Sequence, residues 1–106
     1  MTLEDLKQKI IVFRDRRNWK RYHNPKDLAI SLVLEATEVL EHFQWQNQSQ
    51  QDEYIKKHKE GIADELSDVL HNILLIADEF DIDIEKAFLK KLKKTEKKYP
   101  AARRTN

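Results

Sequence analysis

Cysteine is absent from this 106-residue chain, and glycine and proline are scarce, with one Gly and two Pro. Without cysteine the protein has neither disulfides nor thiolate metal sites. So few turn-forming residues could hardly supply the turns between the strands of a sheet, whereas the abundant Leu, Ile, Lys, Glu and Asp favour helices. The composition therefore predicts an all-α protein.

A long apolar run is also missing. Residues 1–5 include two acids, which argues against a signal peptide, and no segment suits a membrane span. We therefore expect a cytoplasmic protein with no membrane partner. The length fits a single domain, 1–106, and is too short for two cores, so any extra buried surface has to come from self-association.

Neither sign of charge is in excess. The chain has 20 Lys and Arg and 19 Asp and Glu, which gives a net charge of +1. This is not the strongly basic charge that is typical of a nucleic-acid-binding protein. The basic residues concentrate in segment 90–104, beyond a group of mid-chain acids. Such a segment suits an anionic ligand held between a metal and lysines, or it is simply a solvated helix end.

Capping signals and apolar spacing place the first two helices. Thr2 and Asp5 form a predicted capping box, and the apolar residues that follow recur at helical spacing to about Arg17. Asn24-Pro25 is typical of a cap followed by proline at the first helical position. The second helix should end near residues 45–47.

Two further helices follow the polar segment 46–51, which we expect to be a loop. Apolar residues at helical spacing from Ile62 to Phe80 mark a long third helix. Asp81 or Asp83 can cap a last helix that ends before Tyr99-Pro100. Four helices with short connections predict a four-helix bundle-like fold, completed by oligomerisation.

Two acidic pairs stand at matching positions on the second and third predicted helices. Glu35 and Glu38 share a strip with apolar residues on both sides, and so do Glu65 and Asp68. If the helices pack antiparallel, the four carboxylates converge on a partly desolvated patch and repel one another. A hard cation such as Mg²⁺ relieves that repulsion, because it takes oxygen ligands and leaves positions for water and substrate phosphate.

The same acidic pairs have a plainer interpretation. Such pairs are common on exposed helix faces, where they add solubility and weak ion pairing. Di-iron bundles are a further alternative, but they usually require Glu-x-x-His, which is absent here. From the pattern alone, a metal site and a solvated acidic face both stay open.

Five segments in order resemble a known family. They are Trp19–Leu28 (WKRYHNPKDL), Leu34–Glu38 (LEATE), His42–Trp45 (HFQW), Asp64–Leu70 (DELSDVL) and Lys97–Pro100 (KKYP). Together they resemble the MazG-like nucleotide pyrophosphohydrolases, and in particular the short single-domain branch that includes dCTP pyrophosphatase. Leu34 stands where the wider family often has Glu, a departure shared by that branch.

The resemblance implies an all-α NTP pyrophosphatase that binds Mg²⁺ through Glu35, Glu38, Glu65 and Asp68, with Mn²⁺ as an acceptable substitute. It implies water attack on the α-phosphorus of a nucleoside triphosphate, releasing the monophosphate and pyrophosphate. Glu38 is our candidate for the residue that orients or deprotonates the water. The implied role is nucleotide-pool housecleaning, and the implied assembly is a homodimer or homotetramer.

The family's base pocket is matched here by Trp19, His23 and Trp45, the last expected to reach a neighbouring subunit. Indole faces stack on bases, and a histidine can hydrogen-bond a base edge or sugar. Without the resemblance, both tryptophans would be read as core or interface aromatics. Asn72 and Thr95 replace the Tyr and Asn of relatives that favour dCTP, which leaves the preferred base open.

Lys91 matches a family lysine near the phosphates, and Lys98 is a looser candidate from the same tail. Both have solvated charge as their alternative interpretation. Two rival functions remain for the whole chain. One is a non-catalytic helical interaction module. The other is an enzyme of the same fold that acts on another nucleotide, such as dUTP, a damaged nucleotide or a phosphoribosyl nucleotide.

Overall fold

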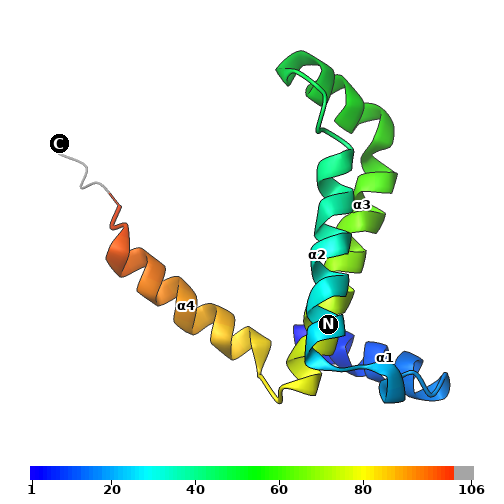
Figure 1. Ribbon diagram of the computed structural model, residues 1–106. Coiled ribbons are helices and arrows are strands. Elements are labelled where there is room, and N and C mark those ends of the chain that lie inside the picture. Colours follow the sequence, from blue (N-terminus) through cyan, green and yellow to red (C-terminus); the bar gives the residue numbers. More distant parts are fainter. Residues whose placement is uncertain (102–106) are drawn as a thin grey trace.

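The computed structural model describes residues 1–101 of the chain (Figure 1). It contains α1 (Leu3–Arg16), a 3₁₀ turn (Lys20–Tyr22), α2 (Pro25–Glu41), α3 (Gln48–Glu79) and α4 (Ile84–Lys98). No strand occurs in this described part, so the all-α prediction is confirmed. Within the same residues no helix is both long and apolar enough to cross a membrane. Arg103 and Arg104, from the basic segment, lie outside the described residues.

The helix starts follow the local capping chemistry. Thr2 accepts a hydrogen bond from the backbone N–H of Asp5, whose carboxylate accepts one from the backbone N–H of Thr2. The Asn24 side chain caps α2 with proline at the first position, and Asp83 caps α4. These bonds satisfy N–H groups that a helix start otherwise leaves free. The predicted starts of these three helices are confirmed.

The connection between α2 and α3 differs from the prediction. The helix α2 ends at Glu41, before the predicted 45–47, and the expected loop 46–51 is wrong because α3 already begins at Gln48. Asn47 and Gln50 form a reciprocal capping box that starts this polar first turn. The helix bends at His58, whose φ of −122° and ψ of 23° are not helical.

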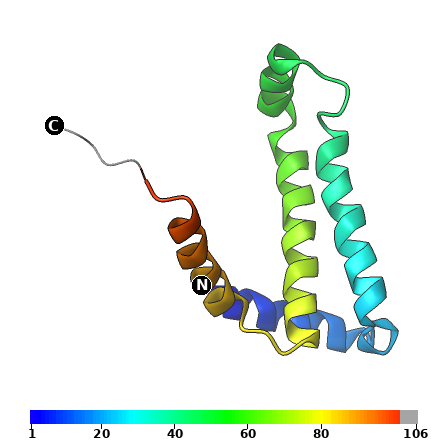
Figure 2. The ribbon, with the colours of Figure 1, turned by 60° about the vertical axis from the view of Figure 1, so that its left-hand side comes forward.

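The helices α2 and α3 run antiparallel side by side, and α1 crosses at their foot (Figures 1 and 2). The last helix, α4, projects away from the pair. The radius of gyration is 17.7 Å, whereas a compact domain of this size has about 13 Å. One chain therefore forms an open arrangement, and closure of a four-helix unit stays a prediction about the assembly.

The core of the described chain is small. Leu28, Leu74, Leu75 and Ala77 are its buried apolar residues, and they lie where the beginning of α2 and the end of α3 meet. Arg14 of α1 is the one buried charged residue in the described part. So little burial is marginal for a free-standing domain, since apolar area removed from water is the main favourable contribution to folding.

Candidate functional site

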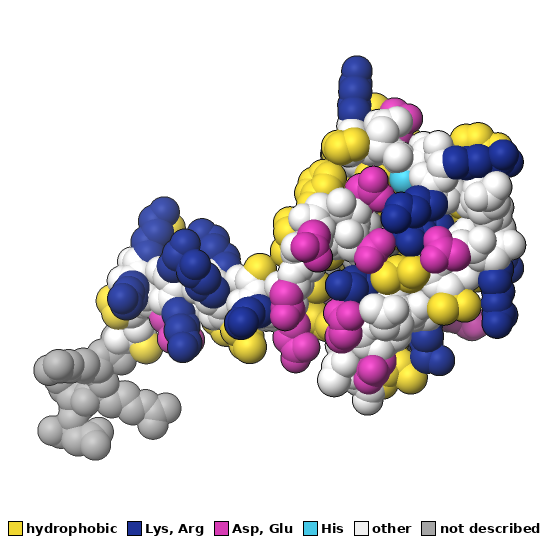
Figure 3. Space-filling model, turned by 90° about the horizontal axis from the view of Figure 1, so that it is seen from below, with side chains coloured by type: hydrophobic (Ala, Val, Ile, Leu, Met, Phe, Trp, Pro, Cys, Tyr) yellow, Lys and Arg dark blue, Asp and Glu magenta, His cyan; other side chains and the backbone are white. Residues whose placement is uncertain are grey.

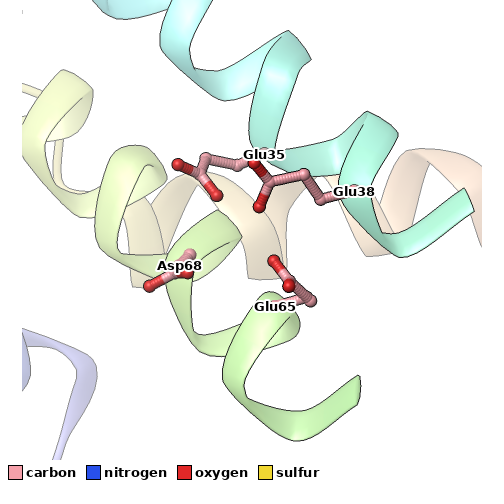
Figure 4. A group of neighbouring side chains, drawn as sticks. All are labelled: Glu35, Glu38, Glu65 and Asp68. Atoms are coloured by element: carbon pink, nitrogen blue, oxygen red, sulfur yellow. The ribbon is translucent and has the colours of Figure 1, made fainter. Parts of the chain in front are cut away.

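Four carboxylates converge between α2 and α3. Glu35 and Glu38 lie one turn apart on α2, and Glu65 and Asp68 lie one turn apart on α3 (Figure 4). One carboxylate oxygen from each residue lies within 4.8 Å of the others. Residues three apart share one face of a helix, and the antiparallel packing turns the two acidic faces toward each other. The structure therefore brings together all four predicted metal ligands.

The cluster carries negative charge that the protein leaves uncompensated. No lysine or arginine in residues 1–101 forms an ion pair with these four carboxylates. The Oε2 atoms of Glu35 and Glu65 are buried and have no hydrogen-bond partner. Buried acceptors without partners are costly, and a shared cation or proton would relieve the cost.

Two of the carboxyl groups hold protons more tightly than usual. The neighbouring Glu38 carboxyl, within hydrogen-bonding range, raises the pKa of Glu65 to about 7, with burial and the surrounding negative charges adding to the effect. Burial, and then the Glu38 carboxyl, raises the pKa of Glu35. Like charges at close range disfavour joint ionisation. A divalent cation fits this donor set, which consists of oxygen atoms alone.

These pKa shifts predict a pH-dependent stability for the metal-free protein. Because folding raises the pKa of Glu65 from its ordinary 4.5 to about 7, the folded state binds more protons than the unfolded state between those values. The contribution of this residue to stability should therefore fall as pH rises through that window. Mg²⁺ should offset the loss, so the increase in melting temperature that it gives should grow with pH.

Melting temperatures measured in chelator and in Mg²⁺, for the wild type and for Glu65→Gln, test this expectation. The variant has no carboxyl at residue 65 to titrate, so its curve in chelator should decline less than that of the wild type over the same window. Parallel curves for the two proteins would contradict the assigned pKa shift.

A cavity of about 280 Å³ opens beside the cluster and is bounded by Glu35 and Asp68. Its other lining residues are Phe13, Arg14, Trp19, His23, Ser31, His71, Asn72 and Leu75. The predicted base-binding residues Trp19, His23 and Asn72 are therefore grouped next to the carboxylates. The volume of this cavity is just below the range of about 300–1,000 Å³ that is usual for small-molecule sites.

The cavity combines aromatic rings with a largely polar lining. The Phe13 ring meets the Trp19 ring edge-on at 5.7 Å and the His71 ring at 6.2 Å, both between centroids. The Nδ1 atom of His23 is buried and has no partner. Burial lowers the pKa of His71, which favours its neutral form. Aromatic rings beside unpaired polar atoms suit a pocket for a flat heterocycle.

Five lining residues were missed at the sequence level. They are Phe13, Arg14, Ser31, His71 and Leu75. Ser31 and His71 could have been found, because each lies within one helical turn of a predicted ligand, Glu35 or Asp68. The residues of α1 carried no such signal, because their place at the site depends on how α1 crosses the helix pair.

Four predicted substrate-binding residues lie away from this cavity. The Trp45 side chain is 86% exposed and lines a separate cavity of about 550 Å³ formed with the start of α3. Lys91, Thr95 and Lys98 lie on α4, exposed to solvent, and that helix projects away from α2 and α3 (Figures 1 and 2). Within one chain these four residues are not brought to the carboxylates.

Comparison with known proteins places these features in context. Residues 30–106 match the model of the MazG-like family. The crystal structure of a pyrophosphatase from Archaeoglobus fulgidus DSM 4304 superposes with a TM-score of 0.86 at 37% sequence identity, covering 92% of each chain. All four carboxylates and most of the cavity fall within the residues that match the family.

Curated relatives include dCTP pyrophosphatase 1 from Rattus norvegicus, which is 31% identical over 101 residues, or 93% of this chain. The dCTP pyrophosphatase 1 from Homo sapiens is 31% identical over 102 residues, or 94% of this chain. The chain spans about three fifths of the length of these relatives, 59% and 60% respectively.

Proposed function

Because this chain belongs to the MazG-like family, we propose that it is a Mg²⁺-dependent nucleoside triphosphate pyrophosphohydrolase of nucleotide-pool housecleaning. The reaction is hydrolysis between the α- and β-phosphates of a (d)NTP, yielding the monophosphate and pyrophosphate. In this proposal residues 1–106 act as a single domain. The relatives named for pyrophosphatase activity support the reaction class.

One observation carries the proposal. Four carboxylates have one oxygen each within 4.8 Å of the others, and two of them, Glu35 and Asp68, line a cavity that holds an aromatic ring pair and an unpartnered histidine nitrogen. The carboxylates suit a cation that binds phosphate, and the cavity suits a base. On a solvated acidic face the carboxylate oxygens would bond to water, whereas one oxygen of Glu35 and one of Glu65 are buried and have no partner.

The residues then divide the work. Glu35, Glu38, Glu65 and Asp68 would hold Mg²⁺, with Mn²⁺ able to take its place. The bound ion would neutralise phosphate charge and lower the pKa of the attacking water. Glu38 would orient that water or take its proton, because its carboxyl lies inside the cluster of four carboxylates.

Base recognition falls to the cavity. The Trp19 ring would stack on the base, and the free Nδ1 of His23 would bond to a base edge or sugar. A dCTP-like or modified dNTP is the favoured substrate, in keeping with the names of the curated relatives. Asn72 also lines the cavity, where its amide Nδ2 donates to the backbone carbonyl of Asp68 at 2.9 Å.

The assembly would complete the site. The exposed helix α4 carries lysines along its length (Figure 3), and it projects away from the helix pair that holds the carboxylates of its own chain. In a homodimer or homotetramer, Lys91, Lys98 and Thr95 of one chain would face the phosphates at a neighbour's carboxylates. The exposed Trp45 would reach a neighbouring base pocket.

The test is pyrophosphate release measured across natural and modified dNTPs and NTPs, in Mg²⁺, in Mn²⁺ and in chelator. We expect turnover with either metal, none in chelator, and the highest kcat/KM for a cytosine nucleotide or a close modification of it. If another nucleotide gave the highest kcat/KM, the proposed reaction would stand and the proposed substrate would be wrong. No pyrophosphate release from any nucleotide would favour the non-catalytic interaction module.

A further inference from the structure

Arg14 is a buried arginine, and only 3% of its surface is exposed. Its Nε donates to Asp15 Oδ1 at 3.0 Å, and its Nη1 donates to Asp78 Oδ2 at 2.8 Å. The bond to Asp78 links α1 to α3. Because a guanidinium keeps its charge in proteins and has a planar fork of donors, two anchoring bonds fix its orientation.

The anchored guanidinium also lines the cavity beside the carboxylates. On α3 the cavity wall runs from Asp68 through His71 and Asn72 to Leu75, and Asp78 follows one turn later. Arg14 therefore lies at the end of the cavity away from Asp68. Five N–H bonds belong to a guanidinium and the two anchoring bonds use two of them, so donors remain for a ligand.

We propose that Arg14 is a specificity-determining residue that donates hydrogen bonds from the inner end of the cavity to acceptor atoms on the base. This role rests on the proposed function, in which the triphosphate lies at the carboxylates and the base lies in the cavity. Arg14 has donors only, so it favours an edge with adjacent acceptors. It opposes an edge that presents an N–H at the same place, since two donors cannot pair.

Pyrimidine bases differ on this point. Cytosine presents O2 and an unprotonated N3 side by side, which a guanidinium fork can meet with two bonds. Uracil and thymine present an N3–H beside O2, which leaves one of the two bonds unmade. Bidentate arginine pairs of this kind give strong discrimination between bases. Among the pyrimidines, Arg14 therefore selects cytosine-type bases, and Asp78 acts as the positioning residue behind it.

The experiment compares kcat/KM for dCTP, dUTP and a baseless analogue, 1,2-dideoxyribose 5-triphosphate, in Mg²⁺. Arg14→Met removes the donors but leaves Asp78 without its partner. The double variant Arg14→Met/Asp78→Leu removes the ion pair as a unit, which buried pairs often tolerate in folded proteins. Arg16→Met is the matched control, because it removes an exposed arginine of the same helix that does not line the cavity.

The wild type should prefer dCTP to dUTP, and both Arg14 variants should lose on the order of 10- to 100-fold in kcat/KM for dCTP. Their turnover of the baseless analogue should match that of the wild type, as should all activities of Arg16→Met. Arg14→Lys should retain only part of the wild-type kcat/KM for dCTP, because an ammonium lacks the planar fork of donors.

Two results would overturn the role of Arg14 while leaving the proposed reaction intact. One is an unchanged ratio of dCTP to dUTP in a folded double variant. The other is an equal loss on dCTP and on the baseless analogue, which would mean that the ion pair only holds α1 in place. No turnover of any nucleotide in the full panel by the wild type would instead overturn the proposed function, and the role of Arg14 with it.

Discussion

Asp68→Asn is expected to reduce turnover of the preferred nucleotide by at least about 100-fold, because the site loses a charged ligand while the helix keeps its shape. Asparagine has nearly the same size as aspartate. The carboxylate of Asp68 is exposed and is not part of the buried core, and the Asn72 amide bonds only to the backbone carbonyl of Asp68. The measurement is pyrophosphate release at saturating Mg²⁺, together with the melting temperature.

The chain offers a close control for this variant. Asp64 lies one turn earlier on α3, is also exposed and lies outside the carboxylate cluster. Asp64→Asn makes the same chemical change and should retain turnover. Near-normal rates in a folded Asp68→Asn protein would remove this residue from the metal site. Glu38→Gln addresses a separate point, since retained turnover there would remove Glu38 from any essential role.

Val33→Lys is expected to break the proposed assembly into monomers and to abolish most of the activity with it. Val33 is 64% exposed in the single chain and lines a cavity of about 300 Å³ with Lys26, Ala29, Ile30 and Leu34 on the outer face of α2. A contiguous exposed apolar patch of this kind is typical of an interface. A buried lysine without a partner there would cost several kcal/mol.

Light scattering gives the mass of the wild type and the variant, and the dCTP assay gives the activity. We expect a dimer or tetramer for the wild type and a monomer with little activity for Val33→Lys. Gln8→Lys is the control, because it adds the same charge to an exposed position of α1. A monomeric wild type that is fully active would contradict both the assembly and the supply of Lys91 by a neighbour.

The parts of this fold that depend on local chemistry were predictable from the sequence. The Thr2 and Asn24 caps and the spacing of apolar residues gave the starts of α1 and α2, and the same helical spacing placed Glu35 beside Glu38. The start of α3 was missed because its first turns are polar and carry no apolar stripe. The Asn47 capping box was the available signal there.

The parts that depend on tertiary contacts were not predictable in the same way. Arg14 is one of three arginines near the end of α1, and helical spacing alone does not distinguish it from the exposed Arg17. Only the crossing of α1 over α3, which brings it to Asp78, makes it buried and places it in the cavity. The roles predicted for Trp45 and Lys91 depend in the same way on contacts that the local sequence does not specify, because both roles require a neighbouring chain.

The central claim is that the four carboxylates form a metal site. It is tested by titrating Mg²⁺ into the protein in a calorimeter, at a pH above the raised pKa of Glu65. The account predicts saturable binding to the wild type and to Asp64→Asn, and binding that is lost or greatly weakened in Asp68→Asn. Saturable binding of equal strength in all three proteins, or none in the wild type, would contradict it.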